Sequence, residues 1–117
     1  MRENPIKDKS FDFALRIVKL YQFLTKEKKE FVMSKQLLCS GTSIGANVRE
    51  GEHAESKADF IHKMAIALKE ANETEYWLLL LYKSDFLSEK AFKSINKDLK
   101  EVLRILISIV KTSKKNK

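Results

Sequence analysis

The chain has 117 residues and a formal net charge of +7, with 33% charged and 44% hydrophobic residues, which indicates one globular domain. Three glycines and one proline are too few for an all-β chain, and the single cysteine excludes an internal disulfide and fits a reducing compartment. Because no apolar stretch resembles a signal peptide or approaches the ~20 residues of a membrane span, we expect a cytoplasmic protein that does not enter a membrane.

Helical periodicity begins with a segment over about residues 10–28. Ser10 is its predicted N-cap, and Phe13, Ile17 and Leu24 repeat at helical spacing. A second segment covers about residues 29–50. Its apolar face is formed by Met33, Leu37, Gly41, Ile44 and Val48, and Gly51 is the predicted left-handed C-cap.

The third predicted helix spans about residues 56–83 and opens with a capping signal, Ser56 followed three residues later by Asp59. Its expected apolar line is Ile61, Ala65, Leu68, Asn72, Glu75, Leu79 and Tyr82, and Met64, Ala67, Ala71 and Leu78 lie beside this line. The fourth spans about residues 88–112, with Ser88 as cap. Together the four segments predict an all-α, antiparallel up-down-up-down four-helix bundle over residues 1–112, followed by a basic disordered tail at 113–117.

Residues 41–45 spell G-x-S-x-G, the pattern of a hydrolase nucleophile elbow. An elbow needs a parallel sheet and a histidine later in the chain, but no strand is predicted and the only histidines are His53 and His62. We therefore expect no catalytic residue and no enzyme. Gly41 and Gly45 instead predict the close approach of a neighbouring helix, with a helix break or a ligand contact as alternatives.

The remaining polar and sulfur-containing residues are interpreted structurally. Asp59 and His62 supply only half of a di-iron motif, so we predict no metal and no cofactor. Glu75, which interrupts an apolar line, is expected to pair with a cation of another helix or subunit. Cys39 is expected to be a buried small hydrophobe rather than a reactive thiol.

The third segment is apolar on more than one side. Trp77, Leu80 and Leu81 lie beyond a single core stripe, and surplus apolar surface of this kind indicates a subunit interface. We therefore expect a homo-oligomer, assembled and packed through Gly41, Gly45, Trp77, Leu80 and Leu81.

Charge is unevenly distributed along the chain. Residues 1–49 carry ten Lys or Arg against five Asp or Glu, residues 50–75 three against seven, and residues 76–117 ten against four. Basic ends favour binding to RNA or DNA through phosphate contacts. The candidate contact residues are Lys19, Lys26, Lys28, Lys29, Lys93, Lys97, Lys100 and Arg104.

The alternative is a protein-interaction scaffold, or an accessory subunit of a nucleic-acid enzyme such as a reverse transcriptase. Its contact surface would be the acidic middle of the chain or the surplus apolar surface of the third helix.

Residues 36–81 carry three blocks: S-G-T-S-I-G-A-N-x-x-E-G, D-F-I-x-K-x-x-I-A-L-K-E-A and E-T-x-Y-W-L. This run resembles the four-helix bundle proteins encoded in intervening sequences of bacterial 23S rRNA genes. The resemblance implies an up-down bundle that assembles into a homo-oligomer, a pentameric ring. That family is also similar to the accessory variability determinant proteins of diversity-generating retroelements, basic pentamers that associate with a reverse transcriptase and nucleic acid.

Overall fold

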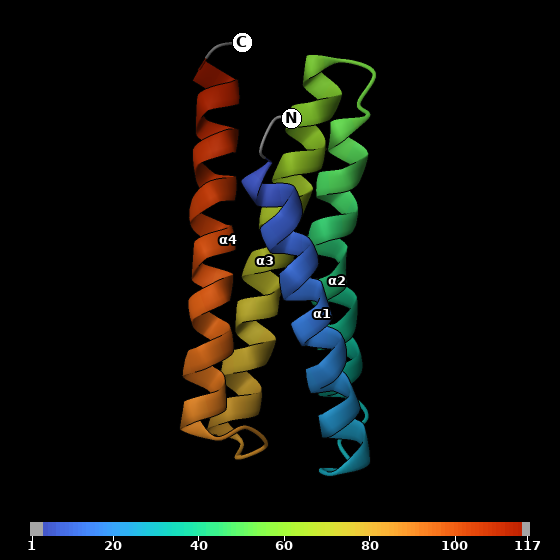
Figure 1. Ribbon diagram of the computed structural model, residues 1–117, viewed down its shortest axis with the longest axis vertical. Coiled ribbons are helices and arrows are strands. Elements are labelled where there is room, and N and C mark those ends of the chain that lie inside the picture. The colour runs from blue at the N-terminus through green and yellow to red at the C-terminus, as the bar shows by residue number, and fades with distance from the viewer. Residues whose placement is uncertain (1–3, 116–117) are drawn as a thin grey trace.

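The computed structural model describes residues 4–115 and contains four helices joined by short loops (Figure 1). They are α1 (Pro5–Lys26), α2 (Met33–Glu52), α3 (Lys57–Lys83) and α4 (Glu89–Lys115). Successive helices run in opposite directions, and each packs against its neighbours in the order α1, α2, α3, α4 and back to α1. The described residues form no strand, so the predicted all-α four-helix bundle is confirmed.

α1 begins more than one turn before the predicted start. The Asn4 side chain accepts a hydrogen bond from the Lys7 N–H, with 3.2 Å between the atoms, and Pro5 occupies the first helical turn. Proline suits this position because it lacks an N–H that would need a partner. The prediction that Ser10 is the N-cap was therefore wrong. Ser10 lies in the second turn of α1, its side chain is buried, and its hydroxyl donates to the Lys7 carbonyl oxygen.

α2 is capped by a residue that precedes it. Glu30 is buried, and its carboxylate accepts hydrogen bonds from the backbone N–H groups of Val32, Met33 and Ser34, the last at 2.7 Å. The Ser34 hydroxyl donates back to the Glu30 carbonyl oxygen at 2.7 Å. These reciprocal bonds satisfy donors that an open helix end leaves without partners. The helix consequently starts at Met33 rather than near residue 29.

The other end of α2 corrects a second prediction. Gly51 is helical, no glycine in the described chain has a positive φ, and the helix continues to Glu52. Gly51 is buried against α3, where an added Cβ would collide with Cε of Met64. The glycine lies at the contact between α2 and α3 and does not form a left-handed turn.

α3 and α4 start at their predicted caps. The Ser56 hydroxyl accepts from the Asp59 N–H at 3.0 Å, and the Ser88 hydroxyl accepts from the Ala91 N–H at 3.1 Å. α4 continues to Lys115, so residues 113–115 are helical rather than part of a disordered tail. Residues 116–117 of that tail lie outside the described part of the chain.

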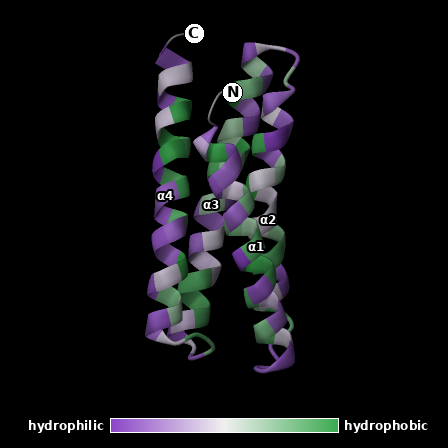
Figure 2. Ribbon diagram, in the orientation of Figure 1, coloured by the Kyte–Doolittle hydropathy of each residue, from purple (hydrophilic) through white to green (hydrophobic). Residues whose placement is uncertain are grey.

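The buried face of α3 is rotated from the centre of the predicted line toward residues that flank it, and Ile61 is the member of that line that is buried. Asn72 and Leu79 are exposed, while the core side chains are Ile61, Met64, Ala67, Ala71, Thr74, Leu78 and Leu81. Figure 2 shows hydrophobic and hydrophilic residues interspersed along the visible parts of the helices. Because α3 is apolar on two sides, its periodicity alone could not identify which side faces the bundle.

α1 lies directly on the glycine face of α2. A Cβ built on Gly41 would be 2.8 Å from Cγ1 of Ile17, and one on Gly45 would be 3.4 Å from the Ser10 carbonyl oxygen. The small residues of α2 therefore allow the backbones of α1 and α2 to approach within the chain.

Candidate nucleic-acid interface

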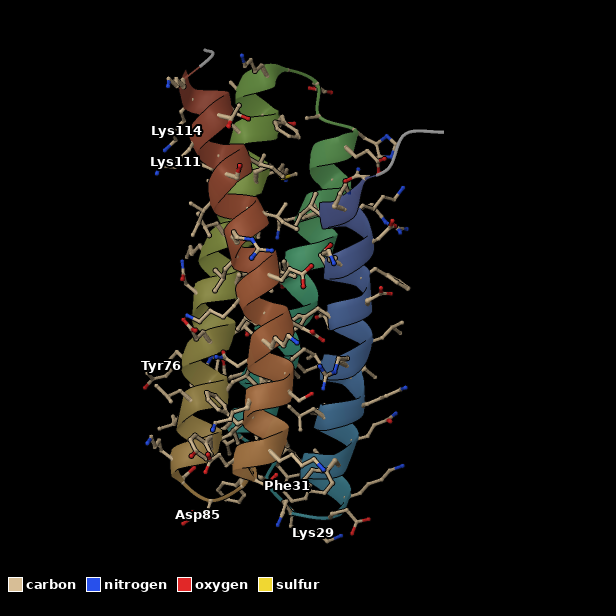
Figure 3. All side chains as sticks on the ribbon, turned by 60° about the vertical axis from the view of Figure 1, so that its left-hand side comes forward. Lys29, Phe31, Tyr76, Asp85, Lys111 and Lys114 are labelled. Carbon is tan, nitrogen blue, oxygen red and sulfur yellow. The ribbon has the colours of Figure 1, made fainter. Side chains whose placement is uncertain are left out.

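A basic stripe, interrupted by the exposed Ile107, runs along the outer side of α4. Its positions follow one another at intervals of three, four or seven residues, and every one of its side chains is exposed. At 100° per residue they share an arc of about 120° and extend over about 36 Å. The stripe, named the α4 stripe below, consists of Lys90, Lys93, Lys97, Lys100, Arg104, Lys111 and Lys114. Figure 3 shows Lys111 and Lys114 projecting at the C-terminal end.

Two of the three carboxylates of α4 pair with α1, and the third, Glu89, lies within the stripe. Asp98 accepts a hydrogen bond at 2.6 Å from Arg16 of α1, and Glu101 pairs with Lys9. These two pairs lie on the flank that faces α1, so they leave the charge of the α4 stripe largely uncompensated.

Two lysines of the α4 stripe have acidic partners of their own. Lys93 pairs with Glu89 one turn earlier at 2.7 Å, and the hydrogen bond and charge of Glu89 raise the pKa of Lys93. Lys100 reaches Glu75 of α3 at 2.6 Å. Within residues 4–115, Lys90, Lys97 and Arg104 form no ion pair.

Glu75 thus has the cationic partner on another helix that was predicted for it. The pair is not buried, since 30% of the Glu75 side chain and 59% of the Lys100 side chain are exposed. Upstream on the same helix, burial and then the nearby charge of Glu73 raise the pKa of Glu70.

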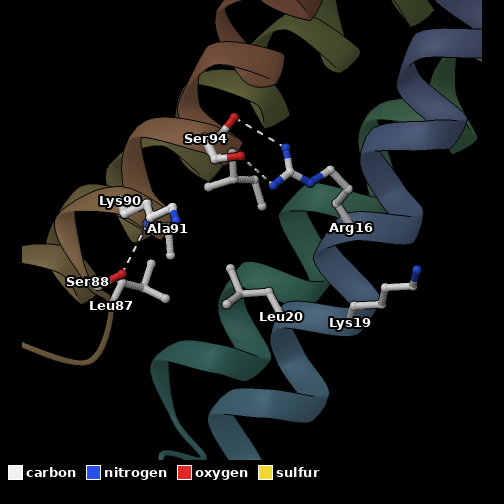
Figure 4. Close-up of a pocket in the computed structure, with 9 residues that line it drawn as sticks. Arg16, Lys19, Leu20, Leu87, Ser88, Lys90, Ala91 and Ser94 are labelled. Atoms are coloured by element: carbon white, nitrogen blue, oxygen red, sulfur yellow. Dashed lines mark hydrogen bonds between the residues drawn. The ribbon is translucent and has the colours of Figure 1, made fainter.

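A groove separates α1 from α4, the two neighbouring helices that pack least extensively. Its walls carry Arg16 and Lys19 from α1 and Lys90 from α4, and its volume is about 580 Å³ (Figure 4). Arg16 bridges the walls by donating to the carbonyl and hydroxyl oxygens of Ser94. An adjoining hollow of about 570 Å³ reaches Lys28, and the two are together named the α1–α4 groove.

The structure divides the eight predicted contact residues between these places. The α4 stripe contains Lys93, Lys97, Lys100 and Arg104. The α1–α4 groove is lined by Lys19 and Lys28. Lys26 and Lys29 are exposed near the end of α1 but line neither hollow. Lys90, Lys111 and Lys114 were not predicted as contact residues, although their spacing along one helical face was a readable signal.

The predicted packing and assembly residues also occupy different environments. Leu81 is fully buried in the core, so it does not belong to a subunit interface. Leu80 remains 36% exposed next to Tyr76 and Leu79, which are also exposed. Trp77 is half-buried, and its Nε1 has no hydrogen-bond partner among the described residues.

The rejected elbow serine participates in ordinary helix bonding. The Ser43 hydroxyl donates to the carbonyl of Cys39 at 2.6 Å, one turn earlier in α2. Cys39 itself is exposed, which corrects its predicted burial, because it lies on the side of α2 away from Leu37 and Ile44. Among the described residues, no group of three His, Cys, Asp or Glu side chains could hold a metal ion, and no helix is long and apolar enough to cross a membrane.

Comparison with known proteins found a family model and solved structures that match the chain. The family model described as 23S rRNA-intervening sequence protein matches residues 2–108. A crystal structure from Bacteroides thetaiotaomicron, described as a protein of unknown function from the S23 ribosomal protein family, is 62% identical. The match covers 91% of this chain and 98% of that one, with a TM-score of 0.90. No curated protein matches the chain.

Proposed function

Because the chain belongs to the 23S rRNA-intervening sequence protein family, we propose that it is a cytoplasmic, non-catalytic homo-oligomer that binds nucleic acid. The observation that carries the proposal is the α4 stripe, in which seven exposed cations share one side of one helix. The family description refers to an rRNA element, so structured RNA is the first ligand to test.

The stripe suits a phosphate backbone better than a base sequence. Lys and Arg on one exposed helix face can each meet a successive phosphate, and such contacts position a nucleic acid without reading its bases. The counterions released on binding make the affinity fall steeply with salt. We therefore expect binding that is strongly salt-dependent and only weakly sequence-specific.

Self-association would repeat the stripe in every subunit. Phe11, Leu15 and Val18 form an exposed apolar line on α1, and Tyr76 and Leu79 are exposed on α3. Exposed apolar clusters favour contact with another protein surface. The resemblance implies five copies, and weak phosphate contacts from several subunits on one RNA would add through effective concentration.

The oligomer can be tested by sedimentation with two matched variants. Leu15→Lys places a charge in the exposed α1 line, and Val32→Lys places the same charge on a 74% exposed side chain just before α2. We expect only Leu15→Lys to dissociate the oligomer. Retention of the oligomer in Leu15→Lys would contradict this interface. It would favour the second candidate for the exposed apolar side chains, a protein partner such as a nucleic-acid-processing enzyme.

Nucleic-acid binding is tested by fluorescence anisotropy of labelled structured RNA and duplex DNA across a salt series. Lys97→Ala with Arg104→Ala removes two charges from the α4 stripe, and Lys35→Ala with Arg49→Ala removes two exposed charges from α2, the helix diagonal to α4. The first pair should weaken binding and reduce the salt slope by about 1 for each phosphate that the variant no longer neutralises.

The α2 variant should bind like the original chain. Equal binding by the two variants would contradict the role of the α4 stripe. Absence of binding near physiological salt would refute the proposed function.

A further inference from the structure

The α1–α4 groove joins an apolar floor to a cationic rim. Leu20 of α1 and Ala91 of α4 lie in both of its hollows, together with Leu87, which is 5% exposed. Lys19 and Lys90 come from opposite walls (Figure 4). Each hollow falls within the usual volume of a small-molecule pocket, about 300–1,000 Å³. The site therefore has room for a flat apolar group held between charges.

The second hollow adds an exposed aromatic ring. Phe23 is 42% exposed there, and Nζ of Lys28 lies over its ring, 5.9 Å from the centroid, in a cation–π contact. An aromatic side chain beside a lysine is the combination that binds single-stranded nucleic acids, because bases stack on the ring while the cation meets the backbone. A fully paired duplex cannot offer a base to this ring, since its bases are already stacked within the helix.

Charge in the groove is strongly one-sided. The lining contains four cations, and Asp85 is its one carboxylate. Arg16 is engaged by Asp98 and Ser94, but Lys19, Lys28 and Lys90 form no ion pair with any described carboxylate. Three lysines thus remain to meet an anionic backbone that crosses the groove.

We infer that the α1–α4 groove binds unpaired nucleotides of RNA, with a base on Phe23 and the floor and the adjacent phosphates on Lys19, Lys28 and Lys90. This rests on the proposed function and deepens it, because the α4 stripe would hold the backbone while the groove selects loops over perfect duplexes. An acidic amphipathic peptide has similar charge and apolar groups, but the exposed ring beside Lys28 favours a stacked base.

The experiment compares two RNAs that carry the same number of phosphates, a hairpin with an adenosine-rich loop and a blunt duplex. Phe23→Ala removes the ring from the groove, and Phe31→Ala removes a 60% exposed ring from the loop before α2, outside the groove. We expect the full chain to prefer the hairpin and Phe23→Ala to lose about tenfold of hairpin affinity, the effect of removing roughly one base–aromatic stack. Duplex affinity should not change, and Phe31→Ala should resemble the original chain.

A fluorescent adenine analogue in the loop gives a readout independent of affinity. Its emission should be quenched by the original chain and by Phe31→Ala, and not by Phe23→Ala. As a second test, Lys19→Gln with Lys28→Gln, two lysines that line the groove and do not belong to the α4 stripe, should weaken hairpin binding more than Lys35→Gln with Arg49→Gln.

The outcomes separate this inference from the proposed function. If both RNAs bind in a salt-dependent way and Phe23→Ala and Phe31→Ala have the same hairpin affinity, the groove assignment is wrong. The proposed binding to the α4 stripe would not be affected by that result. Failure of both RNAs to bind would remove the proposed function and the inference together. If an acidic helical peptide bound in a Phe23-dependent way while the hairpin did not, the groove would be a protein-docking site and the inference would be wrong.

Discussion

The contact between Gly41 and α1 predicts that Gly41→Ala lowers the stability of the protein, whereas Gly45→Ala does not. In Gly41→Ala the new methyl group would lie 2.8 and 2.9 Å from Cγ1 and Cγ2 of Ile17, whose side chain is fully buried. These atoms are the branched root of the side chain and cannot swing away. In Gly45→Ala the closest atom would be the Ser10 carbonyl oxygen at 3.4 Å, an ordinary contact.

The magnitude follows from two opposing terms. Replacing a helical glycine by alanine gains about 1 kcal/mol of helix propensity at either position. Overpacking a filled core costs about 1–3 kcal/mol, and only Gly41→Ala incurs this cost. The propensity gains cancel in a comparison, so Gly41→Ala should be about 1–3 kcal/mol less stable than Gly45→Ala. Gly45→Ala should itself equal or exceed the original chain.

The assay is thermal and urea unfolding followed by circular dichroism, at one fixed protein concentration because self-association shifts apparent stability. For a chain of this length, 1 kcal/mol corresponds to about 4 °C in Tm. The Ile17→Ala background provides the control, since Gly41→Ala should no longer be destabilising once the Ile17 branch is gone. Equal stability of the two glycine variants in the original background would refute the reasoning.

Three further changes test individual helix ends and the α1–α4 contact. Burial raises the pKa of Glu30, but the hydrogen bonds it accepts outweigh burial and leave the pKa lowered. Its stabilising effect is therefore present above the unfolded value of about 4.5 and is lost as pH falls through the folded pKa. Glu30→Gln should cost about 1 kcal/mol at pH 7 in urea unfolding, and much less at pH 3. Ser56→Ala removes the acceptor of the Asp59 N–H and should cost about 1 kcal/mol in thermal unfolding, with no change in the oligomer. Arg16→Lys removes the forked hydrogen bonding to Asp98 and Ser94 and should cost about 0.5–1 kcal/mol in urea unfolding, a difference that high salt should reduce.

Local signals in the sequence predicted the number and order of the helices correctly. Ser56 and Ser88 cap the helices they were expected to cap, because a hydroxyl and a free backbone N–H three residues later need no distant partner. The start of α2 was misjudged because its cap comes from Glu30, an unusual capping residue whose role depends on burial in the loop.

The candidate interface was predicted in part. Four members of the α4 stripe were identified from basic composition. Lys90 and Lys111 follow from the same helical spacing within the predicted helix, and Lys114 follows once α4 is known to reach Lys115. The α1–α4 groove was not predictable from the chain. It exists because α1 and α4 separate near Leu20 and Leu87, residues far apart in sequence.

Local sequence accounts for the four amphipathic helices, their short connections and the excess of basic residues at both ends of the chain, since each is a property of neighbouring residues. Tertiary structure alone decided which side of α3 became the core and which of its leucines stayed exposed. It also decided which carboxylates of α4 were neutralised by α1 and which cations were left unpaired. A helix with two apolar sides, or a lysine with several acids within reach, acquires a defined role only when the other helices take their positions around it.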